Sequence, residues 1–188
     1  HTRYGTVMEF RRVLFRSPRI FVSFGASVEW ASTDTIEVKP KPYEDSRYLI
    51  ENDWSASSYW YEMASLYPSG SVNVVLNGLE DSSRQGDSVV KYIFSLLGIK
   101  TSFKEVHSGK PTSVTLSRHL DHVATLTYDF INCPDLAQTI IATCCALDIP
   151  FHFTGLASLR IKETDRLEAM RKEQIEEHTS ELQSQFRI

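Results

Sequence analysis

RIKETDRL, residues 160–167, places three basic and two acidic side chains within seven consecutive positions, 160–166. An apolar segment, residues 149–159, precedes it, and helix-favouring residues 167–172 follow it. This order predicts a strand, a polar turn and the first turn of a helix, where free backbone N–H groups and the helix dipole suit an anion. Lys162 and Arg166 are four apart and are expected on one helix face, with Glu163 one step round. The same residues also permit a capped helix start with solvated charges.

Outward from this stretch, hydrophobic periodicity and turn residues predict alternating strands and helices. Strands are expected at 20–30 (interrupted at Gly25), 35–39, 48–51, 72–76, 99–106, 113–116, 126–131 and 151–154. Helices are expected at 55–67, from 87 or 88 to 97, and at 136–147. His152 lies in an apolar strand and is expected in the core.

From residue 48 onward the order is β-α-β-α-β-β and then β-α-β-α, which is an internal repeat. The turn at Asp53 matches the turn at Asp135 (135 − 53 = 82), and Gly78 matches Gly155 (155 − 78 = 77). The QGD of residues 85–87 falls where KETD, residues 162–165, falls in the second copy. The repeat predicts an α/β or α+β layered domain with several helix N-termini along one edge.

Composition narrows the class of protein. The chain has 188 residues, 41% of them hydrophobic, and a net charge of -4, which is ordinary for a globular protein and argues against a nucleic-acid surface. No apolar run predicts a membrane span, and the start of the chain does not resemble a signal peptide. Cys133, Cys144 and Cys145 show neither disulfide nor zinc spacing, so a reducing, cytoplasmic setting is expected.

The two ends of the chain are related at the level of codons. EFRRVLF, residues 9–15, can be encoded by GAG TTC AGA CGT GTG CTC TTC, whose reverse complement encodes EEHTSEL, residues 176–182. Inverse copies at opposite ends resemble a sequencing adapter on both sides of an insert. We therefore expect residues 1–17 and 175–188 to be non-native flanks around a partial domain at 18–174. The competing interpretation is that both ends are native helices.

Two carboxylates are candidates for acid–base chemistry. Asp135 starts a helix after Pro134, and Glu163 lies in the parallel turn of the second helix, so the two could share a cleft. A purely structural helix start explains Asp135 equally well. Asp53 and Asp87 are interpreted as helix caps. No glycine-rich phosphate loop and no metal-ligand spacing are present in the sequence.

Four stretches together resemble the C-terminal half of the enolpyruvylshikimate-phosphate synthase family, over about residues 19–173. They are YLIENDWSASSY (48–59), QGD (85–87), NCPD (132–135) and LRIKETDR (159–166), in the family's order and near its spacing. The last is the most specific. The resemblance implies a truncated α/β (α+β) fold of repeated βαβαββ units, the inverted α/β barrel of the enolpyruvyl transferases. Trp54 and the WYE of residues 60–62 depart from the family's small residues and affect packing more than chemistry.

The resemblance also implies an activity. The family transfers the enolpyruvyl group of phosphoenolpyruvate to the 5-hydroxyl of shikimate 3-phosphate and releases phosphate, without a metal or an organic cofactor. Asp135 would accept a proton near the shikimate hydroxyl and bind shikimate 3-phosphate, and Glu163 would donate and accept a proton at the enolpyruvyl carbon. Lys162 would bind shikimate 3-phosphate and Arg166 phosphoenolpyruvate. Ser158 stands where the family often has a substrate-contacting Asn.

The chain lacks the family's N-terminal domain and several later site residues, so we expect it to be inactive by itself. The expected partners are the two small substrates, with a monomer and no nucleic acid or membrane. Two alternatives remain open: the sister enzyme that transfers enolpyruvyl to a UDP-sugar, and a non-catalytic anion-binding module that retained the repeat.

Overall fold

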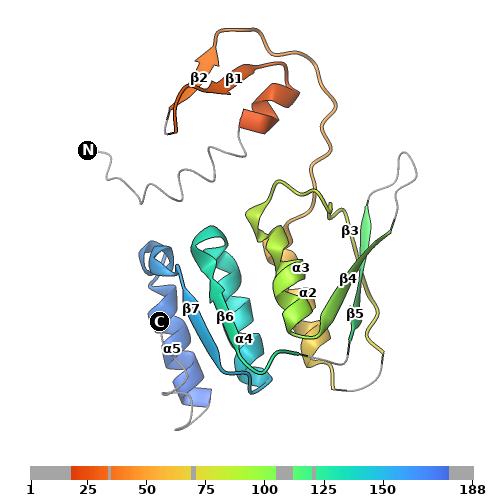
Figure 1. Cartoon of the computed structure of the whole chain (residues 1–188), viewed down its shortest axis with the longest axis vertical. Coiled ribbons are helices and arrows are strands. Elements are labelled where there is room, and N and C mark those ends of the chain that lie inside the picture. Colours follow the sequence, from red (N-terminus) through yellow and green to blue (C-terminus); the bar gives the residue numbers. More distant parts are fainter. Residues whose placement is uncertain (1–17, 34, 69–70, 105–111, 120–121, 178–188) are drawn as a thin grey trace. The chain divides into compact units, whose positions relative to one another are not determined.

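A computed structural model of the chain describes residues 18–33, 35–68, 71–104, 112–119 and 122–177 (Figure 1). The expectations for residues 1–17 and 178–188 therefore lie outside the described residues. The chain divides into two compact units, His1–Ile50 and Glu51–Ile188. Each is described below by itself.

The first unit contains a helical segment at 18–23 and a two-stranded antiparallel sheet. Strand β1 (Ser27–Trp30) pairs with β2 (Ile36–Lys39), and Val28 lies opposite Val38. The strand expected from residue 20 is therefore wrong in its first half. Gly25, at a φ of 81°, ends the helical segment and lets the chain turn into β1.

The strand expected at 48–51 is also wrong, because no regular element forms there. A strand needs a partner for its backbone groups, and none of the described strands pairs with this segment. Its three consecutive apolar residues, 48–50, are exposed instead, with 82% of Ile50 accessible to solvent.

The second unit begins with helix α2 (Trp54–Leu66), which ends before Pro68. Strand β3 (Val74–Asn77) follows, then the 3₁₀ helix η1 (Gly86–Val89) and α3 (Val90–Leu96). Strands β4 (Ile99–Lys104) and β5 (Ser113–Arg118) complete an antiparallel sheet in the order β3-β5-β4. Helices α2 and α3 contact each other and cover one face of this sheet (Figure 1).

The second half of this unit is a β-α-β arrangement. Strand β6 (Leu126–Asp129) pairs in parallel with β7 (Phe151–Thr154), and α4 (Ala137–Ala146) connects them. Helix α5 (Arg166–Glu177) follows β7. Phe151 and Phe153 are buried, whereas His152 between them points to the exposed face, so the expectation of a core histidine is wrong. Successive side chains of a strand point to opposite faces, so His152 lies on the face opposite to the two buried phenylalanines.

Helices α2 and α4 meet through small polar side chains. Ser58, Thr139 and Thr143 are buried there, and the hydroxyls of Ser58 and Thr139 are 3.0 Å apart. Around this contact, rings and aliphatic side chains fill the core, and Tyr61 of α2 packs on Phe94 of α3 with ring centroids 5.3 Å apart. The expected mixed α/β architecture is confirmed.

The internal repeat has a geometric counterpart at the strand ends. Gly78 follows β3 at a φ of 75°, and a Cβ there would lie 2.7 Å from the side-chain nitrogen of Asn52. Gly155 follows β7 at the same φ, and a Cβ there would collide with the Asp129 carboxylate and the backbone of Ile131. Both pairs share one offset, because 155 − 78 = 77 and 129 − 52 = 77.

Candidate functional site

Asp135 lies in an excursion between β6 and α4. The 3₁₀ helices η2 (Phe130–Asn132) and η3 (Pro134–Leu136) form this excursion. The carboxylate of Asp129 starts it by accepting a hydrogen bond of 3.0 Å from the N–H of Ile131. Because Pro134 and Leu136 are both buried, they anchor η3 and leave Asp135 between them at the surface.

The KETD stretch lies between η4 (Ala157–Ile161) and α5. Leu159 is buried and fixes η4, while Lys162 has an extended backbone. Asp165 caps α5, because its carboxylate accepts a hydrogen bond of 3.0 Å from the N–H of Glu168. Lys162 therefore lies before the first residue of α5, and the expectation that it shares a helix face with Arg166 is wrong.

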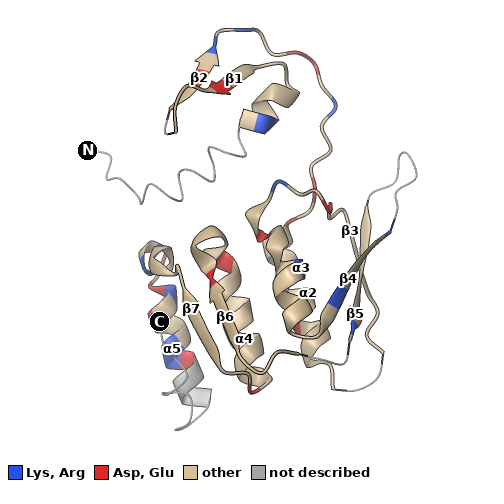
Figure 2. Cartoon of the chain, viewed as in Figure 1, with Lys and Arg blue, Asp and Glu red and all other residues tan. Residues whose placement is uncertain are grey.

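Lys162 and Arg166 nevertheless reach the same carboxylate. Nζ of Lys162 is 3.7 Å, and Nη1 of Arg166 3.3 Å, from Oδ1 of Asp135. Nη2 of Arg166 donates a hydrogen bond of 2.6 Å to Oε2 of Glu163. Figure 2 shows acidic residues where α4 begins and both charges where α5 begins. The structure thus joins four of the five predicted site residues in one charged cluster, which we call the α4–α5 cluster.

Glu163 is held in its ionised form. Its pKa lies below the ordinary value, first because its own backbone N–H hydrogen-bonds the carboxylate, and then because Arg166 donates to it and attracts it electrostatically. The side chain is exposed, so it is open to a ligand. A proton-transfer group in this position would be a base in the free protein.

Gln138 is a member of the cluster that sequence reasoning missed. Its Oε1 accepts a hydrogen bond of 3.4 Å from Nη1 of Arg166. Gln138, in the first turn of α4, comes three residues after Asp135 of η3, and that spacing brings the two side chains to the same side of the chain. That spacing was the available signal. Arg166 is thereby held by three acceptors, two of which are carboxylates.

Ser158, the fifth predicted residue, lies in η4, which contacts η3. Its hydroxyl oxygen is buried and has no hydrogen-bond partner among the described residues. A buried hydroxyl without a partner is unusual, since leaving one unsatisfied costs about 1–3 kcal/mol. Within the described residues its hydroxyl makes no hydrogen bond to the α4–α5 cluster, so its predicted substrate role stays a prediction.

The α4–α5 cluster balances two cations against two carboxylates. An anionic ligand would compete with Asp135 and Glu163 for Lys162 and Arg166, because charge-assisted hydrogen bonds to cations are strong. Displacing Glu163 from Arg166 would also remove one of the causes that keep the pKa of Glu163 low. The geometry therefore suits anion binding coupled to proton transfer.

In the first copy of the repeat, the polar residues at the corresponding positions make hydrogen bonds that hold the fold together. Asp53 caps α2 by accepting a hydrogen bond of 2.9 Å from the N–H of Ser55, as expected. The Gln85 side chain accepts from the N–H of Trp54 at 2.9 Å and donates to the carbonyl of Asn52 at 2.8 Å. Asp87 accepts a short hydrogen bond from the Ser55 hydroxyl.

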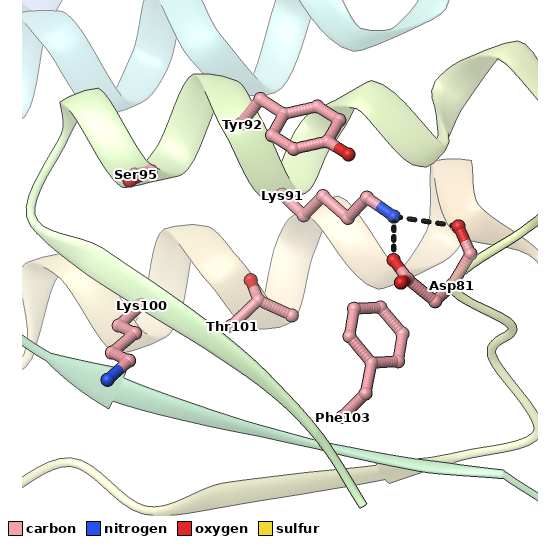
Figure 3. Close-up of a pocket in the computed structure, with 7 residues that line it drawn as sticks. All are labelled: Asp81, Lys91, Tyr92, Ser95, Lys100, Thr101 and Phe103. Carbon is pink, nitrogen blue, oxygen red and sulfur yellow. Dashed lines mark hydrogen bonds and ion pairs between the residues drawn. The ribbon is translucent and has the colours of Figure 1, made fainter.

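A cavity of about 320 Å³ lies beside α3 and β4 (Figure 3). Lys91 enters it, only 6% exposed, with Nζ 2.5 Å from the Asp81 carboxylate and 4.9 Å from the Phe103 ring centroid. Lys91 thus has both a counter-ion and an aromatic neighbour, which explains its burial without a ligand.

The remaining expectations concern metals, thiols and membranes. No group of three potential metal ligands occurs within the residues the structure covers. Cys133, Cys144 and Cys145 are buried as free thiols, and burial raises the pKa of Cys144 to about 12 and that of Cys145 to about 11. In the same residues, every helix is too short or too polar to cross a lipid bilayer.

Comparison with known proteins identifies close relatives. The model of the family described as EPSP synthase (3-phosphoshikimate 1-carboxyvinyltransferase) matches residues 16–175. A 3-phosphoshikimate 1-carboxyvinyltransferase of Bacteroides fragilis is 44% identical over 155 residues, which is 82% of this chain and 36% of the relative. The protein of that name from Methanospirillum hungatei is 32% identical over 153 residues, 79% of this chain and 34% of the relative. The chain spans about a third of the length of these curated relatives.

Proposed function

The chain belongs to the EPSP synthase (3-phosphoshikimate 1-carboxyvinyltransferase) family, and we propose that it is a piece of a longer enzyme of this kind. The parent would transfer the enolpyruvyl group of phosphoenolpyruvate to the 5-hydroxyl of shikimate 3-phosphate and release phosphate, a step toward chorismate and the aromatic amino acids. This chain would supply part of the site, and the rest of the parent would supply the remainder.

The roles follow from the sequence resemblance and are compatible with the contacts of the α4–α5 cluster. Asp135 accepts the proton of the attacking hydroxyl, and Glu163 exchanges a proton with the enolpyruvyl carbon. Lys162 binds shikimate 3-phosphate, Arg166 binds phosphoenolpyruvate, and Ser158 offers a hydroxyl to substrate. Both substrates are polyanions, which cations beside helix starts attract.

The observation that carries the proposal is the position of Arg166. It lies between Asp135 at 3.3 Å and Glu163 at 2.6 Å. A phosphoenolpyruvate held by this guanidinium would have a carboxylate on either side of it. Addition of the hydroxyl needs a base at that hydroxyl and a proton donor at the methylene carbon of phosphoenolpyruvate, and elimination takes a proton back from that carbon. Two carboxylates near the bound phosphoenolpyruvate supply groups for both roles.

The test uses the full-length parent. Asp135→Asn and Glu163→Gln should each lower kcat by about 100-fold or more, since each removes a proton-transfer group but preserves shape. Glu168→Gln is the matched control, because Glu168 lies in α5 close in sequence to Glu163 and its carboxylate pairs with Arg171 at 2.7 Å outside the α4–α5 cluster. Full activity of both site variants would exclude these roles.

The chain alone should show no turnover, because it covers only about a third of the relatives' length. A family-like rate from the isolated chain would contradict this. Titration of the parent with shikimate 3-phosphate, with and without phosphoenolpyruvate, separates the alternatives. Preference for a UDP-sugar would indicate the sister enzyme, and binding without turnover an anion-binding module.

The proposal also covers the fold of the parent, the limits of the native sequence, and the location and oligomeric state of the parent. We propose that the parent repeats the βαβαββ unit, which the shared offset of 77 residues at Asn52/Asp129 and Gly78/Gly155 supports. Residues 1–17 and 175–188 are proposed as non-native flanks, and the family match over 16–175 supports those limits. We also propose a cytoplasmic, monomeric parent that needs no metal or organic cofactor.

A further inference from the structure

The side-chain amide of Gln138 differs in kind from the other groups that hold Arg166. Its Oε1 accepts a hydrogen bond of 3.4 Å from Nη1 of Arg166, whereas Asp135 and Glu163 contact the guanidinium through carboxylates. An ionised carboxylate can only accept hydrogen bonds, but an amide carries both an acceptor and a donor. Of these three side chains, Gln138 is therefore the one that can also donate a hydrogen bond to a ligand at Arg166.

The chemistry of the contact fixes which way this amide is turned. A guanidinium carries only donors, so the amide atom that faces Arg166 has to be the oxygen and not the nitrogen. Within the described residues, Nε2 of Gln138 makes no hydrogen bond. Nor is it one of the buried polar atoms that lack a partner, so solvent reaches it. The two N–H groups of Nε2 are thus open to a ligand.

The neighbours of Gln138 in α4 hold its backbone in place. Ala137 and Thr139 on either side are buried, and the hydroxyl of Thr139 lies 3.0 Å from that of Ser58 on α2. Gln138 itself is half-buried, so its aliphatic stem is packed while its amide is open to solvent. A donor presented from a rigid helix loses less conformational freedom on binding than one on a loop.

An anion bound at Arg166 would meet two carboxylates as well as the cation. Asp135 and Glu163 repel a negative ligand, and neither can donate a hydrogen bond to it while ionised. The oxygen of the Gln138 amide contacts the guanidinium, so one anion with several oxygens can reach both Arg166 and Nε2. A hydrogen bond to an anionic oxygen is charge-assisted and stronger than one between neutral groups. We propose that Gln138 is a substrate-binding residue, whose Nε2 donates a hydrogen bond to an anionic oxygen of the phosphoenolpyruvate at Arg166.

This inference rests on the proposed function, because it names the substrate of the proposed transferase. The test introduces Gln138→Met into the full-length parent, which keeps the length of the side chain but removes the amide. The KM for phosphoenolpyruvate should rise about 10-fold or more, while kcat and the KM for shikimate 3-phosphate stay within about 3-fold. Glu168→Met is the control, because it removes a polar side chain of the same length outside the α4–α5 cluster, and it should change neither KM.

A second variant, Gln138→Glu, separates substrate binding from a role in positioning Arg166 alone. Its carboxylate still accepts from Nη1 of Arg166 but has no donor and repels the anion. The KM for phosphoenolpyruvate should therefore rise at least as far as in Gln138→Met. If Gln138 only holds Arg166 in place, Gln138→Glu should keep the wild-type KM, and that result would overturn the proposal. A wild-type KM in Gln138→Met, or a rise confined to shikimate 3-phosphate, would also overturn it.

Nuclear magnetic resonance of the parent labelled with ¹⁵N in its glutamine side chains observes the contact without any turnover. The Gln138 amide signal is assigned by its loss in Gln138→Met. Saturating phosphoenolpyruvate, with shikimate 3-phosphate left out, should move one of the Nε2 proton signals downfield, because a hydrogen bond to an anionic oxygen deshields the proton. Nε2 signals that stay in place at saturation would show that Gln138 does not contact this substrate.

The two proposals fail separately. A parent that carries out enolpyruvyl transfer, but whose Gln138→Met variant keeps the wild-type KM for phosphoenolpyruvate, would contradict the role of Gln138 and keep the function. A parent that shows the amide shift with phosphoenolpyruvate but no transfer would do the reverse.

Discussion

Arg166 and Asp135 are 31 residues apart in the chain, yet Nη1 of Arg166 lies 3.3 Å from Oδ1 of Asp135. The contact joins the start of α5 to the excursion before α4. Since Arg166 also donates to Glu163, one guanidinium links the two carboxylates that the proposed chemistry requires.

Arg166→Gln should raise the pKa of Glu163. The substitution removes the hydrogen bond and the charge of Arg166 but keeps the backbone N–H that is the first cause of the low pKa, so the rise is partial. Carboxyl NMR titration measures it. Lys162→Gln is the control and should move the pKa less, because the attraction of Lys162 is the smallest of the causes.

The sign of the associated stability effect follows by linkage. A carboxylate whose pKa is lowered by folding stabilises the fold above its unfolded pKa, and this stabilisation is lost as pH falls through the folded value. In Arg166→Gln the folded pKa lies closer to the unfolded one, so the stabilisation should be smaller and its loss should be complete at a higher pH than in the wild-type chain. An unchanged pKa for Glu163 would show that the Arg166 contact does not form in solution.

Gly155→Ala should destabilise the chain more than Gly78→Ala. Both glycines have a φ of 75°, so both substitutions strain the backbone. The Cβ at 155 would also collide with the backbone of Ile131, whereas the Cβ at 78 would meet only the flexible side chain of Asn52. We expect about 2–4 kcal/mol for Gly155→Ala and about 1–2 kcal/mol for Gly78→Ala in urea unfolding. Equal losses would contradict the close approach.

Ser58→Ala should cost more than Thr139→Val. Ser58 donates its proton to the carbonyl of Ser55 at 2.6 Å, so Thr139 must donate in the contact between the two hydroxyls. Ser58→Ala leaves that buried donor without its acceptor and should cost about 1–3 kcal/mol, whereas Thr139→Val removes the donor and costs about 1 kcal/mol. The double variant should cost less than the sum. Chemical denaturation of the four proteins completes the cycle.

Alkaline pH should remove the stability that Cys144 and Cys145 contribute. Folding raises their pKa values to about 12 and about 11, chiefly through burial. Because the raised values keep the thiols neutral, the contribution is complete below the ordinary thiol pKa near 9 and is lost as pH rises through the folded values. The stability gap between wild type and Cys144→Ala/Cys145→Ala should narrow from pH 8 to about 10.5. A constant gap would exclude this linkage.

The sequence predicted elements whose pattern is local. Helix α2, bounded by Asp53 and Pro68, and the β4–β5 pair were placed within a few residues, because caps, breakers and alternation act over short distances. The strand at 48–51 failed because a strand depends on a partner elsewhere in the chain. The strand predicted from residue 20 was wrong at its start, where residues 18–23 are helical, because a short apolar run fits a strand and a helix equally well.

The same division holds at the candidate site. Asp135, Lys162, Glu163 and Arg166 were predicted as site residues and do lie together. The sequence predicted that Lys162 and Arg166 come together because they share a helix face. In the structure they come together because both contact Asp135. Gln138 was missed because a neutral amide in a helix has no distinctive pattern, and its contact with Arg166 appears only when α4 and α5 are placed side by side.

The excursion between β6 and α4 has a consequence for how such a site can arise. Asn52 and Asp129 are 77 residues apart and the turns at Asp53 and Asp135 are 82 apart, so 82 − 77 = 5 extra residues lie between the two positions in the second copy. Those residues include η2 and lead to Asp135. A gene duplication followed by a short insertion could therefore add a carboxylate to one copy while the other kept its scaffold contacts, and the glycine junctions common to both would be left untouched.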